Sequence, residues 1–144
     1  MQTLLEEPYF KKVAPKSTGR ELFNLQWLGK VLRSHRLVSA ENVQATLLEL
    51  TVQTIAVEAK RYELESLIVC GGGVNNRFLM ERLANNLEEI DVTCSDEQGV
   101  DSEQMEAMLF AWLAYKRMHN EVVAMKNVTG ARRDGILGGL YAGA

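Results

Sequence analysis

The sequence predicts an α/β protein in which long helices pack on a small, mostly parallel sheet. The run SLIVCG (66–71) is apolar, contains β-branched residues and ends in glycine, which is typical of a buried parallel strand. The run IDVTC (90–94) is the second expected strand. Helical patterns precede the first run and follow each of the two, so the expected order of elements is α–α–β–α–β–α.

The composition is that of one globular domain. The chain has 144 residues, of which 47% are hydrophobic and 24% are charged. Its net charge of −3 argues against nucleic acid as a partner, because proteins that bind nucleic acid usually carry a basic face. No apolar run approaches the roughly 18 residues that a membrane span needs. The N-terminus lacks a signal-peptide pattern, and Cys70 and Cys94 imply no disulfide framework. We therefore expect a cytoplasmic protein.

The first half of the chain is expected to be helical around one irregular connector. The first residues resemble a helix end that Pro8 closes, and residues 8–21 contain both prolines of the chain. A helix over 22–34 follows, with leucines at helical spacing. Ser39 is a good N-cap for a longer helix that runs to about Tyr62. The wide apolar face of that helix is expected to pack against a sheet.

Two more helices are expected in the second half. The first covers residues 76–87, and the second covers 101–119, with Asp101 as its N-cap and Gln104 at the capping-box position. Residues 105–115 are so apolar that this helix is expected to be buried nearly all round. The glycine-rich tail is expected to end in a short strand or helix.

The glycine turn at Gly71, Gly72 and Gly73 joins the first strand to the helix that begins near Asn76. Glycine allows a close approach of the backbone to a ligand, and a helix N-terminus attracts anions. The segment lacks the lysine of a P-loop and the third glycine of the dinucleotide fingerprint. Two interpretations remain open: a ligand-binding turn, or a tight turn in which Asn76 is only the helix cap.

Glu106 is the only charged residue between 105 and 115. A buried carboxylate is costly unless it is paired or used, so Glu106 is a candidate for accepting hydrogen bonds from substrate hydroxyls. The alternative is a surface residue near the start of its helix, where the helix dipole favours negative charge.

Two other groups of polar residues are weaker candidates. The first is a loop made of Lys16, Ser17, Thr18 and Gly19. One interpretation is that this loop contacts an anion; the other is that it ends the connector and caps the next helix. Four acidic residues do not match the spacing of a calcium loop, so a solvated loop leading into a helix is expected there instead: Asp96, Glu97, Asp101 and Glu103. No metal site is expected in this chain.

Three segments together resemble one family, anhydro-N-acetylmuramic acid kinase, and they occur in the same order. They are PYFKKVAPKSTGRELFNLQWL (8–28), LIVCGGGVNNRFLMERL (67–83) and VDSEQMEAMLFAWLAY (100–115). The tail VTGARRDGILGGLY (128–141) also resembles the C-terminus of that family. The resemblance covers almost the whole chain.

The resemblance implies an actin-like, ribonuclease H-like sugar kinase fold, with two α/β domains around an ATP cleft. Such kinases use ATP, Mg²⁺ and water to open the 1,6-anhydro bond of a sugar recycled from peptidoglycan, and they form N-acetylmuramic acid 6-phosphate. Carried over to this sequence, Gly71, Gly72, Gly73 and Asn76 become nucleotide contacts, and Glu106 is expected near the sugar.

Members of that family are much longer, so the resemblance also implies that residues 1–144 are a single partial domain, the C-terminal part of the kinase. The loop that holds the β- and γ-phosphates and the catalytic base are expected in an N-terminal part, and this chain alone is expected to be inactive. A sheet this small leaves an exposed edge or face, from which we expect a homo-oligomer. The alternative is a non-catalytic, oligomerising α/β module that binds no ATP usefully.

Overall fold

The structure is a computed structural model that describes residues 1–35 and 37–141. The helices of this part are α1 (Gln2–Leu5), α2 (Leu25–Leu32), α3 (Ala40–Arg61), α4 (Arg77–Asn86), α5 (Met105–Met118) and α6 (Lys126–Thr129). The strands are β1 (Ser66–Val69) and β2 (Asp91–Cys94). Three short 3-10 helices are η1 (Pro8–Lys11), η2 (Gly72–Asn75) and η3 (Ser95–Gln98).

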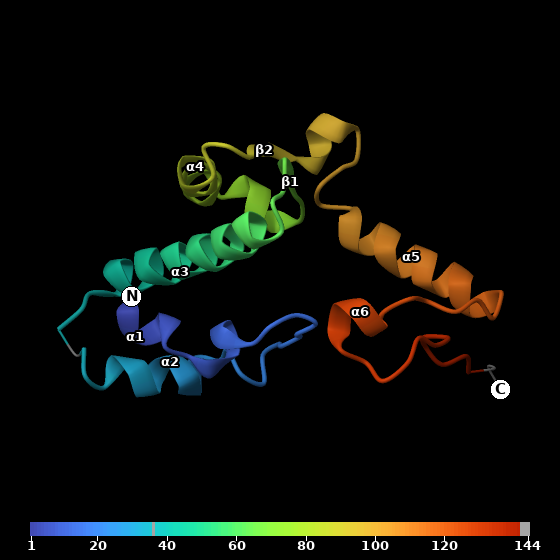
Figure 1. Ribbon diagram of the computed structural model, residues 1–144, viewed down its shortest axis with the longest axis horizontal. Coiled ribbons are helices and arrows are strands. Elements are labelled where there is room, and N and C mark those ends of the chain that lie inside the picture. The colour runs from blue at the N-terminus through green and yellow to red at the C-terminus, as the bar shows by residue number, and fades with distance from the viewer. Residues whose placement is uncertain (36, 142–144) are drawn as a thin grey trace.

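The long helix α3 lies at the centre of the arrangement. Figure 1 shows α1 and α2 on one side of α3 and the unit of β1, β2 and α4 on the other, while α5 and α6 form a separate lobe at one end. This is the predicted α/β fold with a small parallel sheet. No helix in the described ranges combines the length and the hydropathy that a membrane crossing requires.

The sheet has two parallel strands, with Leu67 opposite Val92 and Ile68 opposite Thr93. Leu67 and Val92 face a small core made by Ala56 and Ala59 of α3 and by Leu87, the C-cap of α4. The α3 helix is therefore held against one face of the sheet by the apolar face that its sequence predicts.

The boundaries of α3 and α4 confirm the predicted caps. The hydroxyl of Ser39 accepts a hydrogen bond from the N–H of Asn42 at 3.3 Å, and Tyr62 is the C-cap of α3. Helix α2 is shorter than predicted, because Asn24 rather than a residue near 22 begins it: its side chain accepts hydrogen bonds from the N–H groups of Gln26 and Trp27.

The prediction that the first strand is buried is wrong. The residues of β1 alternate between exposed and half-buried, and Ile68 is 51% exposed, whereas β2 is half-buried after the exposed Asp91. The core cluster of α3 and α4 residues packs on the face of the sheet that contains Leu67 and Val92, while Ile68 on the other face is about half exposed. The parallel pairing itself is confirmed.

Two predictions about α5 are also wrong. The helix is not buried nearly all round: Phe110 is 62% exposed and Tyr115 is 55% exposed. Its N-cap is Gln104, without a side-chain cap bond, rather than Asp101 in a capping box. The carboxylate of Asp101 instead accepts a hydrogen bond from the N–H of Glu103 at 2.9 Å.

The tail forms neither the short strand nor the short helix expected at 135–141. Among the residues described there, Gly135 makes a single antiparallel bridge with the buried Val123. The carboxylate of Asp134 accepts a hydrogen bond from the N–H of Lys126 at 2.8 Å, which ties the tail to the start of α6.

An ion pair joins α3 to α4, and its contribution to the stability of the fold depends on pH. The guanidinium of Arg82 donates to the carboxylate of Glu49 at 2.8 Å, and this bond holds the pKa of Glu49 below its usual value of 4.5. A lowered folded-state pKa means that Glu49 stabilises the fold above pH 4.5 and that this contribution is lost as the pH falls through the folded pKa.

We therefore expect Glu49→Gln to lower the melting temperature at pH 7 by about 2 °C. The difference from the unmodified chain should shrink as the pH falls below the usual glutamate pKa. Thermal unfolding followed by circular dichroism at several pH values checks this. A difference that stays constant down to acidic pH would show that the carboxylate charge is not responsible.

Candidate active site

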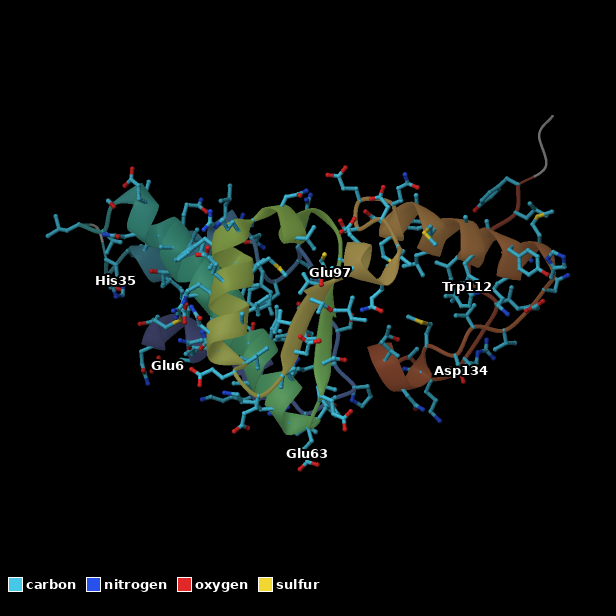
Figure 2. All side chains as sticks on the ribbon, turned by 90° about the horizontal axis from the view of Figure 1, so that it is seen from above. Glu6, His35, Glu63, Glu97, Trp112 and Asp134 are labelled. Carbon is cyan, nitrogen blue, oxygen red and sulfur yellow. The ribbon has the colours of Figure 1, made fainter. Side chains whose placement is uncertain are left out.

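The candidate site lies at the carboxyl ends of the two parallel strands. Gly71 follows β1 directly after Cys70, and η3 follows β2 directly after Cys94. Ligands of α/β proteins usually bind outside the carboxyl ends of parallel strands. Figure 2 shows Glu97 of η3 where the strands meet the turn that leads to α5.

Gly71 begins the turn in a backbone conformation that suits glycine alone, with φ of 76° and ψ of −177°. Its N–H donates to the carbonyl of Ser102 at 2.9 Å, and its own carbonyl accepts from Val74 at 3.2 Å. The turn is therefore bonded on both sides and has a defined shape.

The space around the three glycines of the turn is largely open. A Cβ atom on Gly71 or on Gly72 would meet no heavy atom within 4 Å, and one on Gly73 would meet only the Leu79 side chain at 3.6 Å. Gly72 and Gly73 are the first two residues of η2. The N–H groups at the start of a helix have no carbonyl acceptor within that helix. The backbone of this turn is thus accessible to a ligand, and the exposed amides suit an anionic or polar one.

Asn76 caps α4. Its side-chain oxygen accepts a hydrogen bond from the N–H of Leu79 at 3.1 Å, as the cap interpretation expects. Asn76 also lines a groove of about 510 Å³ between α3 and the start of α4. The apolar part of this groove is formed by five side chains: Ala45, Leu47, Leu48, Phe78 and Leu79.

The segment just before α5 contacts the turn, and the sequence gives no signal of this. Ser102 is 4% exposed; its carbonyl accepts from Gly71, and its N–H donates to the carboxylate of Asp96 at 3.3 Å. Hydrogen bonds from the side chain and backbone of Ser102 hold the pKa of the Asp96 carboxyl below its usual range. The side chain of Asn75 donates to the Glu103 carboxylate at 3.1 Å. Two polar links therefore join the turn to residues 102–103.

Glu106 lies on the surface in the first turn of α5. The expectation that its helix is buried around it is wrong, and the position favours the alternative in which the helix dipole stabilises the charge. Because α5 begins three residues after Ser102, Glu106 still lies on the element that is bonded to the glycine turn.

The loop of Lys16, Ser17, Thr18 and Gly19 makes other contacts. The ammonium of Lys16 donates to Glu58 of α3 at 2.9 Å, and the N–H of Gly19 donates to Glu21 at 2.7 Å. Lys16 also lines a groove of about 590 Å³ with Tyr9 and Tyr62. None of the hydrogen bonds between described residues joins this loop to the glycine turn.

A Mg²⁺ ion has no ready set of protein ligands here. Residues 1–35 and 37–141 contain no group of three or more His, Cys, Asp or Glu side chains that could hold a metal ion. The four acidic residues near η3 are exposed, as the solvated-loop interpretation expects. Three of them accept local hydrogen bonds, whereas Glu103 accepts from the distant Asn75.

Comparison with known proteins identifies relatives over the whole chain. The family model described as anhydro-N-acetylmuramic acid kinase matches residues 1–143. Proteins with that name from Sulfurimonas denitrificans and from a Sulfurovum species are 53% and 49% identical over 98% of this chain. The protein of that name from Actinobacillus pleuropneumoniae serotype 7 is 46% identical over 98% of the chain. The chain spans about 40% of the length of the curated relatives it matches. The order of the motifs, the glycine turn at the carboxyl ends of two parallel strands and these identities agree: the chain belongs to the anhydro-N-acetylmuramic acid kinase family.

Proposed function

We propose that this chain is the C-terminal, nucleotide-binding part of a cytoplasmic sugar kinase that phosphorylates 1,6-anhydro-N-acetylmuramic acid in peptidoglycan recycling. The observation that supports this best is the glycine turn, which presents open backbone at the carboxyl ends of β1 and β2 in a chain of this family. Gly71, Gly72 and Gly73 would contact the nucleotide through their backbone.

The groove beside Asn76 supports the placement of adenosine. Asn76, three residues after Gly73, lines it, and the apolar side chains of Leu47, Leu48 and Phe78 suit the face of a base. Phe78 is 51% exposed, so its ring is available for stacking. Because the side-chain oxygen of Asn76 already caps α4, its amide nitrogen is the group left to donate to the nucleotide.

Glu106 would act on the sugar side. Its exposed carboxylate lies on the helix that residues 102–103 tie to the glycine turn, so sugar and nucleotide would be held at a defined separation. A carboxylate accepts hydrogen bonds from sugar hydroxyls.

The reaction that such a kinase catalyses balances as follows. Water supplies the hydroxyl at C1 as the bond from C1 to the bridging oxygen O6 breaks, and the other proton of the water is released. The γ-phosphoryl group passes to O6, and ADP leaves. Bound ATP supplies that phosphoryl group. The described residues do not form a metal site, so we assign no residue of this chain to Mg²⁺ and none to the catalytic base.

A chimeric enzyme tests this proposal. We would replace the matching segment of the Sulfurimonas denitrificans relative, which is 53% identical, by this chain. The chimera is expected to convert anhydro-N-acetylmuramic acid and ATP to the 6-phosphate and ADP, and the 144-residue chain alone is expected to be inactive. A folded chimera without kinase activity, alongside an active parent enzyme, would contradict the proposal.

A second candidate function is a non-catalytic, oligomerising module, and the exposed apolar side chains of α5 favour it. Met108, Trp112 and Tyr115 are 51%, 46% and 55% exposed, and their spacing places them on one face of the helix. Figure 2 shows Trp112 in the same lobe as Asp134, away from Glu6 and His35. We propose that a second copy of the chain covers this face.

Trp112→Glu is therefore expected to shift the chain from dimer to monomer at micromolar concentration, because a charge would be buried in an apolar interface. Size-exclusion chromatography with light scattering measures the mass. Glu89→Gln, an exposed change next to β2, is the control and should leave the dimer intact. A monomeric unmodified chain would rule out this use of α5.

A further inference from the structure

Ser102 is the point at which the two sides of the candidate site are joined. It lies between η3 and α5, and its backbone is bonded in both directions. Its carbonyl accepts from Gly71, which follows β1, at 2.9 Å. Its N–H donates to Asp96, which follows β2, at 3.3 Å.

The carboxylate of Asp96 accepts hydrogen bonds from both the backbone and the side chain of Ser102, and its role follows from the burial of Ser102. Ser102 is 4% exposed, so an unpaired N–H there would be costly. Asp96 lies at the surface, and it reaches back to Ser102 from η3. The hydrogen bonds from Ser102 that lower its pKa stabilise the charged carboxylate.

We propose that Asp96 is a positioning residue that, through Ser102, holds the glycine turn at a fixed place relative to the start of α5. This inference rests on the proposed function, since it is the nucleotide at Gly71–Gly73 and the carboxylate of Glu106 whose separation would be set. The bond from Asn75 to Glu103 is a second link across the same junction, but both of its partners are exposed, so it is the weaker link.

Two substitutions separate the negative charge of Asp96 from its ability to accept a hydrogen bond. Asp96→Asn keeps an oxygen that can accept from the N–H of Ser102, whereas Asp96→Ala removes the acceptor and leaves that buried N–H unpaired. The matched control is Asp91→Ala. Asp91 is also an exposed aspartate, but it lies at the amino end of β2, and its carboxylate takes part in no hydrogen bond between described residues.

The test combines amide hydrogen exchange at Gly71 with calorimetric titration by Mg·ATP, both on the 144-residue chain. In Asp96→Ala we expect exchange at Gly71 to be at least about tenfold faster and the nucleotide to bind about fivefold more weakly or worse, because the turn loses its support. Asp96→Asn should restore most of both properties, and Asp91→Ala should match the unmodified chain. A thermal melt of each variant verifies that it is folded.

The outcomes distinguish this inference from the proposed function. Unchanged exchange at Gly71 in Asp96→Ala would overturn the relay. Faster exchange with an unchanged affinity for Mg·ATP would overturn the positioning role while leaving nucleotide binding intact. If the unmodified, folded chain binds no Mg·ATP, the proposed function of the turn in this chain fails and the positioning role fails with it.

Discussion

Leu87→Ala is expected to destabilise the protein by about 3 kcal/mol, because it deletes buried methyl groups and leaves a cavity. Leu87 is 1% exposed and packs with Ala56 and Ala59 of α3. The half-buried Leu67 and Val92 of the strands complete this cluster, so the one side chain joins α3, α4 and the sheet. Urea denaturation followed by circular dichroism measures the loss.

Leu109→Ala is the control for this prediction. Leu109 is 50% exposed on α5, and the same truncation there should cost less than about 1 kcal/mol. Equal losses for the two variants would contradict the packing described for α3, α4 and the sheet.

Gly71→Val is expected to lose nucleotide binding and to lower the stability together. The φ angle of 76° with ψ near 180° is one that side-chain-bearing residues rarely adopt, and holding valine there costs about 1–3 kcal/mol. Either the strain is kept or the turn rearranges and loses its bond to Ser102. Thermal melting and titration with Mg·ATP measure the two effects. A variant with unchanged stability and unchanged binding would show that the shape of this turn is unimportant.

The sequence predicts the local elements well where a residue type suited to a helix cap or a turn marks the boundary. Ser39 and Asn76 are the caps of α3 and α4, because each supplies a side-chain oxygen to an otherwise unpaired N–H. The glycine turn is where the sequence predicts it, between a strand and a helix. Gly71 has a positive φ angle, a conformation that glycine adopts more easily than other residues.

The sequence does not predict which apolar faces are covered. An apolar pattern indicates what gains from burial, but burial needs a partner. Ile68 and Phe110 remain more than half exposed. This is why the predictions of a buried first strand and a buried α5 are wrong although the elements themselves form.

The start of α5 shows how a tertiary contact overrides a local signal. Asp101 and Gln104 have the spacing of a capping box, yet the helix begins only at Met105. The N–H and the carbonyl of Ser102 are already used by Asp96 and Gly71, so this residue cannot join a helical ladder. The relay of Asp96, Ser102 and Gly71 joins positions far apart in the chain, and no local pattern reveals it.

Gly72→Val tests most directly whether the glycine turn holds a nucleotide. A side chain at Gly72 enters open space and meets no heavy atom within 4 Å of its Cβ, so the fold should tolerate it, and the melting temperature should change by less than about 3 °C. The same side chain would occupy the space through which a ligand approaches the backbone. In calorimetric titrations with Mg·ATP, we predict binding to the unmodified chain and at least about a tenfold loss in Gly72→Val, equivalent to about 1.4 kcal/mol. Equal affinity in the two folded proteins would contradict the claim, since the nucleotide would then bind elsewhere.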